Sequence, residues 1–280
     1  MSLTRIAFAF GVNINPVMLL ARLFFSCLAP DNPFYSIFTF FLSNTMTLIS
    51  VVVPTLNEEK SLPAFFKSLK KCRMDDYEVI IVDKFSPDKT AEIAEANGAR
   101  VLSRKLSLGD SRTAGLKAAK GKIVASLDAD SILCDCWLDI VKKDFEMIEG
   151  LQALGGPSYY GNALYDTLSV ATQFQNNFLP LTGFAFIPGN NSAFDRKNLL
   201  KLGGWNGKYQ EEVDLSIRLF ESKAKIYYDW DLKLKLSDRR FKQVGFAPTV
   251  YQWIKDNVDI VMRKERDRGD YSAWRKEKKK

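Results

Sequence analysis

Four short runs of apolar, mostly β-branched residues follow one another after residue 47, and a helix-forming stretch separates each run from the next. The first run, at 48–53, reads LISVVV, and the fourth, at 122–128, reads KIVASLD. Continuous apolar runs of this length are typical of strands that are buried on both faces. Strands joined by helices in this order predict an α/β protein with a doubly wound, mostly parallel sheet and flanking helices.

Local signals predict the other elements of this region. Further strands are expected at 77–83 and 99–104, and a helix at 110–120. Apolar residues at helical spacing predict a helix at 62–71. The segment 86–99 predicts another helix, and Gly98 is its C-terminal stop signal. Beyond residue 130 the pattern is less regular: the Gly-Asn-Asn at 189–191 and the Gly-Gly at 203–204 are interpreted as turns around a short helix at 196–202.

Polar side chains follow three of the predicted strands at the point where each strand ends. The segment 54–58 reads PTLNE, Asp83 ends the second strand, and Asp128 and Asp130 follow the fourth. Ligands of open parallel sheets bind at the carboxyl ends of the strands. We therefore expect one crevice to collect these side chains.

Asp128 and Asp130 form a closely spaced carboxylate pair. In extended backbone the side chains of residues i and i+2 point to the same side, so a cation is needed to offset their repulsion. Mg²⁺ and Mn²⁺ prefer hard oxygen ligands, commonly one or two carboxylates together with substrate phosphates. An exposed acidic turn after a strand would have the same sequence, so the pair alone leaves both interpretations open.

The chain has no histidine and four cysteines, namely Cys27, Cys72, Cys134 and Cys136. Catalytic Ser-His-Asp and Cys-His arrangements are therefore excluded, and carboxylates are the expected chemical groups. Cys134 and Cys136 have no second matching pair, so we expect no structural zinc site. We interpret the cysteines as reduced thiols of a cytosolic protein.

Three motifs resemble, in order, the nucleotide-sugar-binding half of the family 2 glycosyltransferases, whose Rossmann-like fold is called GT-A. They are PTLNE at 54–58, VDKFSPDKT at 82–90, and SRTAGLKAAKGKIVASLDAD at 111–130. The usual forms in the family are P-T-x-N-E, then V-D-x-x-S-x-D-x-T, then R-x-x-G-x-x-x-A-x-G before L-D-A-D. The resemblance covers roughly residues 47–245, and the combination is more specific than any one motif.

The resemblance implies a binding site for a UDP- or GDP-linked sugar. The residues that would line the base and ribose are Pro54, Thr55, Asn57 and Glu58, and Asp83 would accept a hydrogen bond from the base. Lys84 and Phe85 replace the Asp-Gly that commonly follows the first acid, so the identity of the base stays open.

The same resemblance assigns the diphosphate and a metal to the third motif. Arg112 would support the diphosphate, Asp128 would reach the ribose or the metal, and Asp130 would hold Mn²⁺ or Mg²⁺. The LSDRRF segment at 236–241 resembles the S-x-R-R-F element of archaeal-type, non-processive members, and either Arg239 or Arg240 would meet a phosphate. The Q-x-x-R-W signature of processive synthases is absent, which favours addition of a single sugar.

The candidate general base lies at 211–214. The family pattern here is E-D-x-D-L-x-x-R-L, and its second acid deprotonates the acceptor hydroxyl. Glu212 occupies that position, and Glu211 and Asp214 are the other candidates. Acids in the first turn of a helix also stabilise the helix dipole, which is a sufficient structural reason for them. A lipid-phosphate acceptor is already anionic and would need no base.

Together these features predict a metal-dependent, inverting transferase that moves one sugar to a hydroxyl or lipid-phosphate acceptor on a glycan, protein or lipid. Two other classes stay open. One is a non-catalytic nucleotide-sugar-binding protein, favoured if Glu212 cannot act as a base. The other is a sugar-phosphate nucleotidyltransferase, although its Gly-rich loop is missing after Val53.

We divide the chain into three parts: an apolar extension at 1–45, the transferase domain at 46–246, and an amphipathic helix with a basic tail at 247–280. The domain has a nucleotide-sugar half at 46–133 and an acceptor half at 134–246. Charged and proline residues interrupt the extension, so its apolar runs are too short for a spanning helix. We expect an appendage that is dispensable for the chemistry, and three interpretations stay open: a membrane-lying hairpin, a signal-like segment, or residues that precede a translation start at Met46. The terminal helix either packs on the domain or makes a peripheral contact at the cytoplasmic face of a membrane. Nucleic acid is not an expected partner, because aromatic residues are not interleaved with the basic ones.

Overall fold

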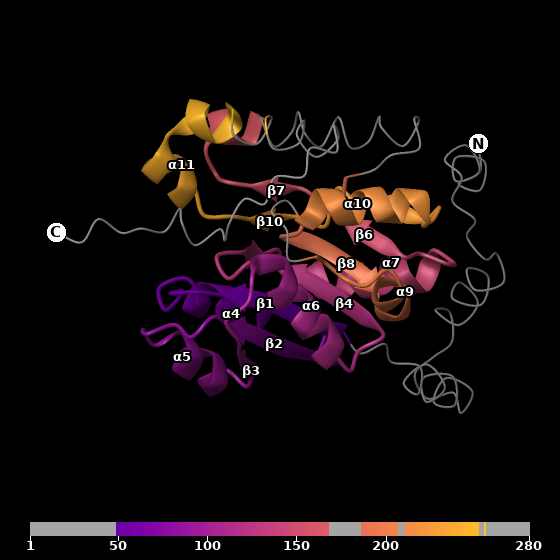
Figure 1. The fold of residues 1–280 in the computed structure, drawn as a ribbon, viewed down its shortest axis with the longest axis horizontal. Helices are drawn as coiled ribbons and strands as arrows, with labels where there is room; N and C mark the ends of the chain where they lie inside the picture. Colours follow the sequence, from indigo (N-terminus) through magenta and orange to yellow (C-terminus); the bar gives the residue numbers. More distant parts are fainter. Residues whose placement is uncertain (1–48, 168–185, 207–210, 252–254, 256–280) are drawn as a thin grey trace, which may run out of the picture.

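The computed structural model describes residues 49–167, 186–206, 211–251 and 255 (Figure 1). The predictions for 1–45, and those for 247–280 beyond residue 251 apart from residue 255, lie outside these residues. The central sheet has seven strands in the order β3-β2-β1-β4-β8-β6-β9. Their bounds are β1 Ile49–Thr55, β2 Tyr77–Asp83, β3 Arg100–Ser103, β4 Ile123–Leu127, β6 Ala153–Gly155, β8 Asn191–Asp195 and β9 Ile226–Tyr228.

The four predicted strands are adjacent and parallel, which confirms the expected mostly parallel α/β sheet. β1 lies between β2 and β4, and its last residue, Thr55, is in register with Asp83, the last residue of β2. β8 runs antiparallel to both β4 and β6. The carboxyl ends of β1, β2 and β4 therefore meet at one edge of the sheet, where the motifs place their polar residues.

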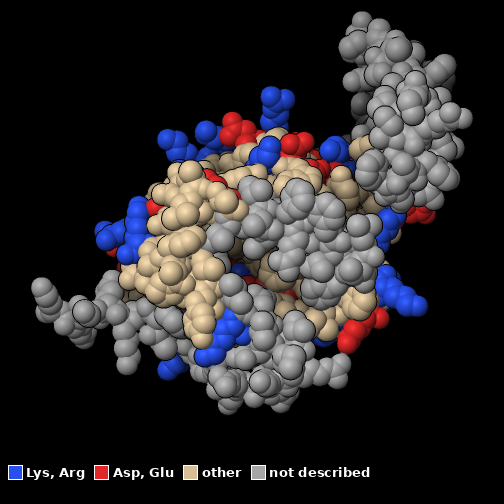
Figure 2. Space-filling model, turned by 90° about the horizontal axis from the view of Figure 1, so that it is seen from above, with Lys and Arg blue, Asp and Glu red and all other residues tan. Residues whose placement is uncertain are grey.

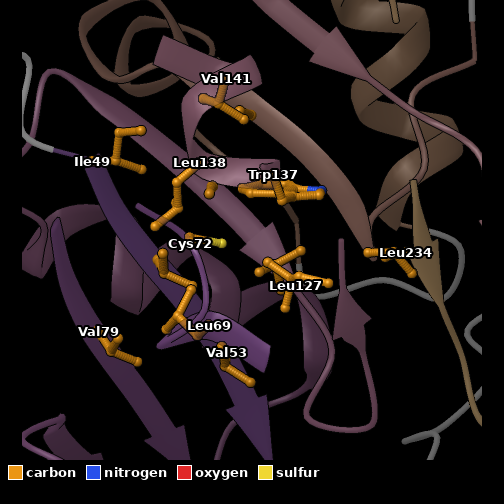
Figure 3. Close-up of a cluster of buried hydrophobic side chains, with 14 of the residues drawn as sticks. Ile49, Val53, Leu69, Cys72, Val79, Leu127, Trp137, Leu138, Val141 and Leu234 are labelled. Atoms are coloured by element: carbon orange, nitrogen blue, oxygen red, sulfur yellow. The ribbon is translucent and has the colours of Figure 1, made fainter. Parts of the chain in front are cut away.

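Helices cover both faces of the sheet (Figure 1). They are α4 Leu62–Leu69, α5 Thr90–Ala96, α6 Leu108–Ala118, α7 Trp137–Met147, α9 Arg196–Lys201, α10 Glu211–Glu221 and α11 Arg239–Val244. Successive residues of β1 face opposite cores: Val51 and Val53 pack in the cluster with α4 and α7, and Val52 packs in the cluster with α6, α9 and α10. Figure 3 shows the first of these clusters. This two-sided burial explains why the strand is mostly apolar.

Several helix ends differ by one or two residues from the sequence prediction, among them those of α6 and α4. The helix expected at 110–120 begins at Leu108, because Ser107 caps it: the Ser107 hydroxyl accepts from the Asp110 N–H at 3.2 Å and donates to the Asp110 carboxylate at 2.7 Å. The helix expected at 62–71 ends at Leu69.

A second, three-stranded sheet contains β5 Ile132–Leu133, β10 Leu234–Lys235 and β7 Ser158–Tyr159 in the order β5-β10-β7. It joins the segment that follows Asp130 to the segment that leads into α11. An aromatic cluster then fixes α11: the Phe241 ring stacks on Tyr165 at 4.3 Å and meets the edge of Tyr160 at 5.0 Å. α11 is thereby held against the segment that follows β7.

Candidate active site

Asp83 joins the ends of β1 and β2 through its buried carboxylate. Thr55 Oγ1 and Ser86 Oγ donate to Asp83 Oδ1 at 2.9 and 2.6 Å, and the Ser86 N–H donates to Oδ2 at 2.8 Å. A carboxylate can accept about four hydrogen bonds, so capacity for about one more remains. Asp83 lies where the resemblance placed it, and it also braces the loop around it.

Two residues beside Asp83 have left-handed backbone. Asn57 has φ 57° and Phe85 has φ 55°. Hydrogen bonds hold both loops together, from the Asn57 N–H to Ser86 Oγ and from the Lys84 N–H to the Thr55 carbonyl. Asparagine tolerates this conformation, whereas a bulky side chain is strained in it. The Phe85 backbone is therefore strained, and its side chain is 63% exposed at this edge of the sheet.

Arg112 supplies a cation for Asp128, the first member of the carboxylate pair. From α6 its Nη2 donates to Asp128 Oδ1 at 2.8 Å, and its Nη1 donates to Glu211 Oε1. The guanidinium is buried and lies against Gly189, where a Cβ would be only 3.0 Å from Nη1. Two carboxylates therefore engage Arg112, and its support of a diphosphate stays a prediction.

Arg239 holds a second group of acids. Its Nη2 and Nη1 donate to the two oxygens of the buried Glu58 at 3.0 and 3.3 Å, and Nη2 lies 3.9 Å from Asp130 Oδ2. Burial, together with the Asp128 and Glu58 carboxylates, raises the pKa of Asp130 to about 7, although Arg239 opposes this. The side chain of Arg240 lies outside the described part of the structure.

The three acids of α10 have different surroundings. Burial, and then the neighbouring Glu212 carboxylate, raise the pKa of Glu211 above its ordinary value, although Arg112 acts in the opposite direction. Asp214 pairs with Arg218 at 2.7 Å, and Arg218 also donates to the Gly204 carbonyl at 2.8 Å, so Asp214 helps to fix the turn at 203–204. Glu212 is half-buried beside Glu211.

The donor atoms around Asp128 and Asp130 suit a hard divalent cation. Both are carboxylates, both are partly exposed, and Asp130 lies among like charges that a cation would offset. In the described ranges no three His, Cys, Asp or Glu side chains are grouped closely enough to hold a metal ion. The protein would thus supply two carboxylates, and substrate phosphates and water would complete the coordination.

Several residues that shape the site were not identified from sequence. Ser86 lies within the VDKFSPDKT motif, but the motif does not predict its contacts with Asp83 and Asn57. Ser126 Oγ donates to the Gly189 carbonyl at 2.6 Å and so fixes the loop that covers Arg112. The serine of the family pattern V-D-x-x-S-x-D-x-T is the only sequence signal that Ser86 belongs to the site. No sequence signal points to Ser126.

Charges of both signs surround the face seen in Figure 2, where Lys and Arg are interspersed with Asp and Glu around the rim. Among the helices of the described ranges, none has the length and apolar character needed to cross a membrane.

The chain belongs to the family described as Glycosyl transferase family 2, whose model matches residues 50–202, just over half of its length. The match includes Asp83, Arg112 and both carboxylates of the pair, and it ends before α10 and α11. Membership in this family favours the transferase interpretation over the nucleotidyltransferase that the sequence had left open.

Individual relatives and solved structures agree with this family. An undecaprenyl-phosphate 4-deoxy-4-formamido-L-arabinose transferase of Proteus mirabilis is 36% identical over 93 residues, which cover 29% of this chain and 28% of that protein. Glucosyl-3-phosphoglycerate synthase from Mycobacterium tuberculosis is 26% identical with a TM-score of 0.53, over 70% of this chain and 72% of that one.

A mannosyltransferase from Pyrobaculum calidifontis, solved with GDP-Man and Mn²⁺, has a TM-score of 0.52 and 18% identity over 68% of this chain and 56% of that one. These neighbours share the GT-A fold that the motifs predicted. This chain matches only about a third of the length of these curated relatives. The activities in their names are therefore stated of those proteins and not of this chain.

Proposed function

We propose that this protein is an inverting glycosyltransferase that moves one sugar from a nucleoside-diphosphate sugar to an acceptor. One observation carries the proposal: Arg112 connects Asp128, at the end of β4, to Glu211, at the start of α10. Glu212, the candidate base, adjoins Glu211 on α10, which supports a role for it beside the carboxylates of the donor side. Donor and acceptor chemistry can then meet at one point.

The donor would bind across the ends of β1 and β2. Asp83 has hydrogen-bonding capacity for a base N–H, and Pro54, Thr55 and Asn57 lie at the same edge of the sheet. A structure of glucosyl-3-phosphoglycerate synthase with UDP, 26% identical to this chain, supports a nucleoside diphosphate as the ligand class. UDP- and GDP-sugars are the donors to compare.

Asp130, with Asp128, would hold Mn²⁺ or Mg²⁺. When bound, such a cation neutralises charge on the leaving diphosphate. Arg239 would add positive charge beside it: its side chain is 40% exposed, and the buried Glu58 fixes its orientation through two hydrogen bonds. An arginine near a diphosphate makes strong, charge-assisted hydrogen bonds.

Glu212 would accept the proton of the acceptor hydroxyl. The acceptor oxygen then attacks the anomeric carbon from the face opposite the nucleoside diphosphate, and the bond to the diphosphate oxygen breaks with inversion at that carbon. A positioned base of this kind contributes roughly 10²- to 10⁴-fold to the rate. Glu211 and Asp214 are already paired with Arg112 and Arg218, which supports Glu212 as the base.

The acceptor is either a hydroxyl, on a glycan, a protein or a lipid, or a lipid phosphate. The Proteus mirabilis relative is named for transfer to undecaprenyl phosphate, which supports the second class. A lipid acceptor would place the enzyme at the cytoplasmic face of a membrane through a peripheral contact.

The test is release of nucleoside diphosphate from a panel of sugar nucleotides with acceptor extract, in Mn²⁺, in Mg²⁺ and in chelator. The parent is compared with Asp130→Ala and Glu212→Gln. Two exposed acids provide matched controls: Asp135 lies in the turn after β5, and Glu221 lies at the other end of α10. The control variants are Asp135→Ala and Glu221→Gln. Both controls should keep parental activity.

We expect turnover to need the metal and to fall by at least about 10²-fold in Asp130→Ala. A fall of about 10²- to 10⁴-fold in Glu212→Gln indicates a hydroxyl acceptor, and an unchanged rate indicates a phosphate acceptor. If sugar nucleotides bind to the parent but no acceptor supports turnover, the protein is a nucleotide-sugar-binding protein and the proposal is wrong.

A further inference from the structure

Two thiols lie in contact in a tight turn just beyond the aspartate pair. Cys134 and Cys136 flank Asp135 between β5 and α7, and their sulfur atoms are 3.7 Å apart. The Trp137 N–H donates to the Cys134 carbonyl at 3.1 Å, which closes the turn. The turn therefore places both side chains on one side of the backbone.

The turn lies at the surface, where the two sulfurs have room to approach each other. A disulfide has an S–S distance of about 2.05 Å, so the two atoms must approach by roughly 1.7 Å. Cys136 is exposed, and the Asp135 side chain is 74% exposed. Small changes in the side-chain and turn dihedrals can therefore close the gap without displacing the core.

We propose that Cys134 and Cys136 are a reversible dithiol–disulfide pair that exchanges with low-molecular-weight disulfides of the glutathione class. The Cys136 thiolate attacks one sulfur of the small disulfide, whose S–S bond breaks and releases one small thiolate. The Cys134 thiolate then attacks Cys136 Sγ and releases the second. The two cysteines lose two electrons and two protons, which convert the small disulfide into two thiols.

The surroundings of the two thiols support this order of attack. Burial, and the hydrogen bond with Cys136, raise the pKa of Cys134 to about 11, whereas Cys136 is the exposed member of the pair. Thiolate formation and access decide which cysteine reacts first. Cys72 is a natural control: it is buried, and its Sγ is 3.7 Å from the Cys134 carbonyl oxygen.

The pair also lies at a junction of the fold. The Cys134 N–H donates to the Lys233 carbonyl at 3.3 Å, and Cys134 Sγ is 3.8 Å from the Asp231 carbonyl oxygen. These contacts lie beside the pairing of β5 with β10, between the segment after Asp130 and the strand that leads to Arg239. This modification site is separate from the donor-binding residues.

The experiment equilibrates the full-length protein with mixtures of reduced and oxidised glutathione at pH 8, quenches with acid, and alkylates free thiols. Trypsin releases both cysteines in one peptide, 123–142, and Cys72 in another. Oxidation should shift the first peptide to a form that has lost two hydrogens and carries neither alkyl group nor glutathione. The Cys134→Ser variant should instead stop at a glutathione adduct on Cys136.

Cys72→Ala should form the disulfide as the parent does, and circular dichroism would verify that all variants fold. Two results would overturn the proposal. One is a parental peptide that keeps its glutathione adduct as long as Cys134→Ser does. The other is a parental peptide that retains both thiols in a large excess of oxidised glutathione.

Discussion

Phe85 combines a left-handed backbone with a largely exposed ring. Its φ of 55° costs a residue with a Cβ about 1–2 kcal/mol, and its ring, 63% exposed, regains little of that through burial. We predict that Phe85→Gly is more stable than Phe85→Ala by about 1 kcal/mol, because only glycine removes the Cβ. Urea unfolding of the two variants measures the difference in free energy of unfolding.

The comparison of Gly with Ala at position 85 separates strain from the loss of the ring, because both variants lack the ring. At an unstrained site the order is the reverse, with Ala more stable by about 0.4–1 kcal/mol. Equal stability, or a more stable Phe85→Ala, would mean that the backbone at 85 relaxes and stores no strain. Strain at this position would suggest a role in ligand binding, since such conformations cluster at functional sites.

The sequence identified individual site residues better than it identified their partners. Asp83, Arg112 and Asp128 could be named because they recur at fixed offsets within short motifs. The contacts of Arg112 with Glu211 and of Arg239 with Glu58 join residues 99 and 181 positions apart, and no local pattern encodes them. The need for a cation beside Asp128 was predictable from charge alone, but the identity of that cation as Arg112 depends on the tertiary fold.

The packing of α6 on β1 depends on Gly115. A Cβ at this position would lie 2.2 Å from Val52 Cγ1, so helix and strand approach more closely than any larger residue allows. We predict that Gly115→Ala lowers the free energy of unfolding by about 1–3 kcal/mol through overpacking, although alanine is the better helix former. Urea unfolding of the variant tests this.

A second substitution gives the control for that prediction. Val52→Ala removes both methyl groups of Val52, including the one nearest the new Cβ, at the usual cost of a cavity. The double variant should therefore be destabilised by less than the sum of the two single variants, by about 1 kcal/mol or more. Additive effects would show that Gly115→Ala acts through something other than contact with Val52.

Long, regular elements were predictable, and short irregular ones were not. The four buried strands and the helices between them have enough residues for periodicity to appear, whereas β5, β7 and β10 have two residues each. The prediction of a turn at 189–191 is wrong for Asn191, because this residue begins β8. Its amide donates to the Pro157 and Leu232 carbonyls and its oxygen accepts from Trp137 Nε1, so tertiary hydrogen bonds override the local preference of asparagine for turns.

A buried pair of carboxyl groups, Asp144 and Asp229, links α7 to the segment after β9. Lys143 Nζ lies 3.4 Å from Asp144 Oδ1 and 4.0 Å from Asp229 Oδ2, so one lysine faces both carboxyl groups. Burial and Asp229 raise the pKa of Asp144 to about 7, while Lys143 opposes this. The pair therefore makes the stability of the fold depend on pH.

The sign of this dependence follows from linkage. The folded pKa of Asp144 lies above the ordinary value of 3.8, so its contribution to stability is complete below about pH 4 and is lost as the pH rises through about 7. Between pH 5.5 and 8 this loss amounts to about 2 kcal/mol. Asparagine resembles the protonated acid, so Asp144→Asn should gain about that much stability relative to the parent as the pH rises over this range.

Urea unfolding of parent and Asp144→Asn at both pH values gives the double difference. Asp130 and Glu211 also have raised pKa values, but they are present in both proteins and cancel in the comparison. The exposed Asp135→Asn variant should change by the same amount as the parent between the two pH values. If Asp144→Asn and the parent lose stability in parallel, Asp144 titrates near its ordinary value and is not the source of the pH dependence.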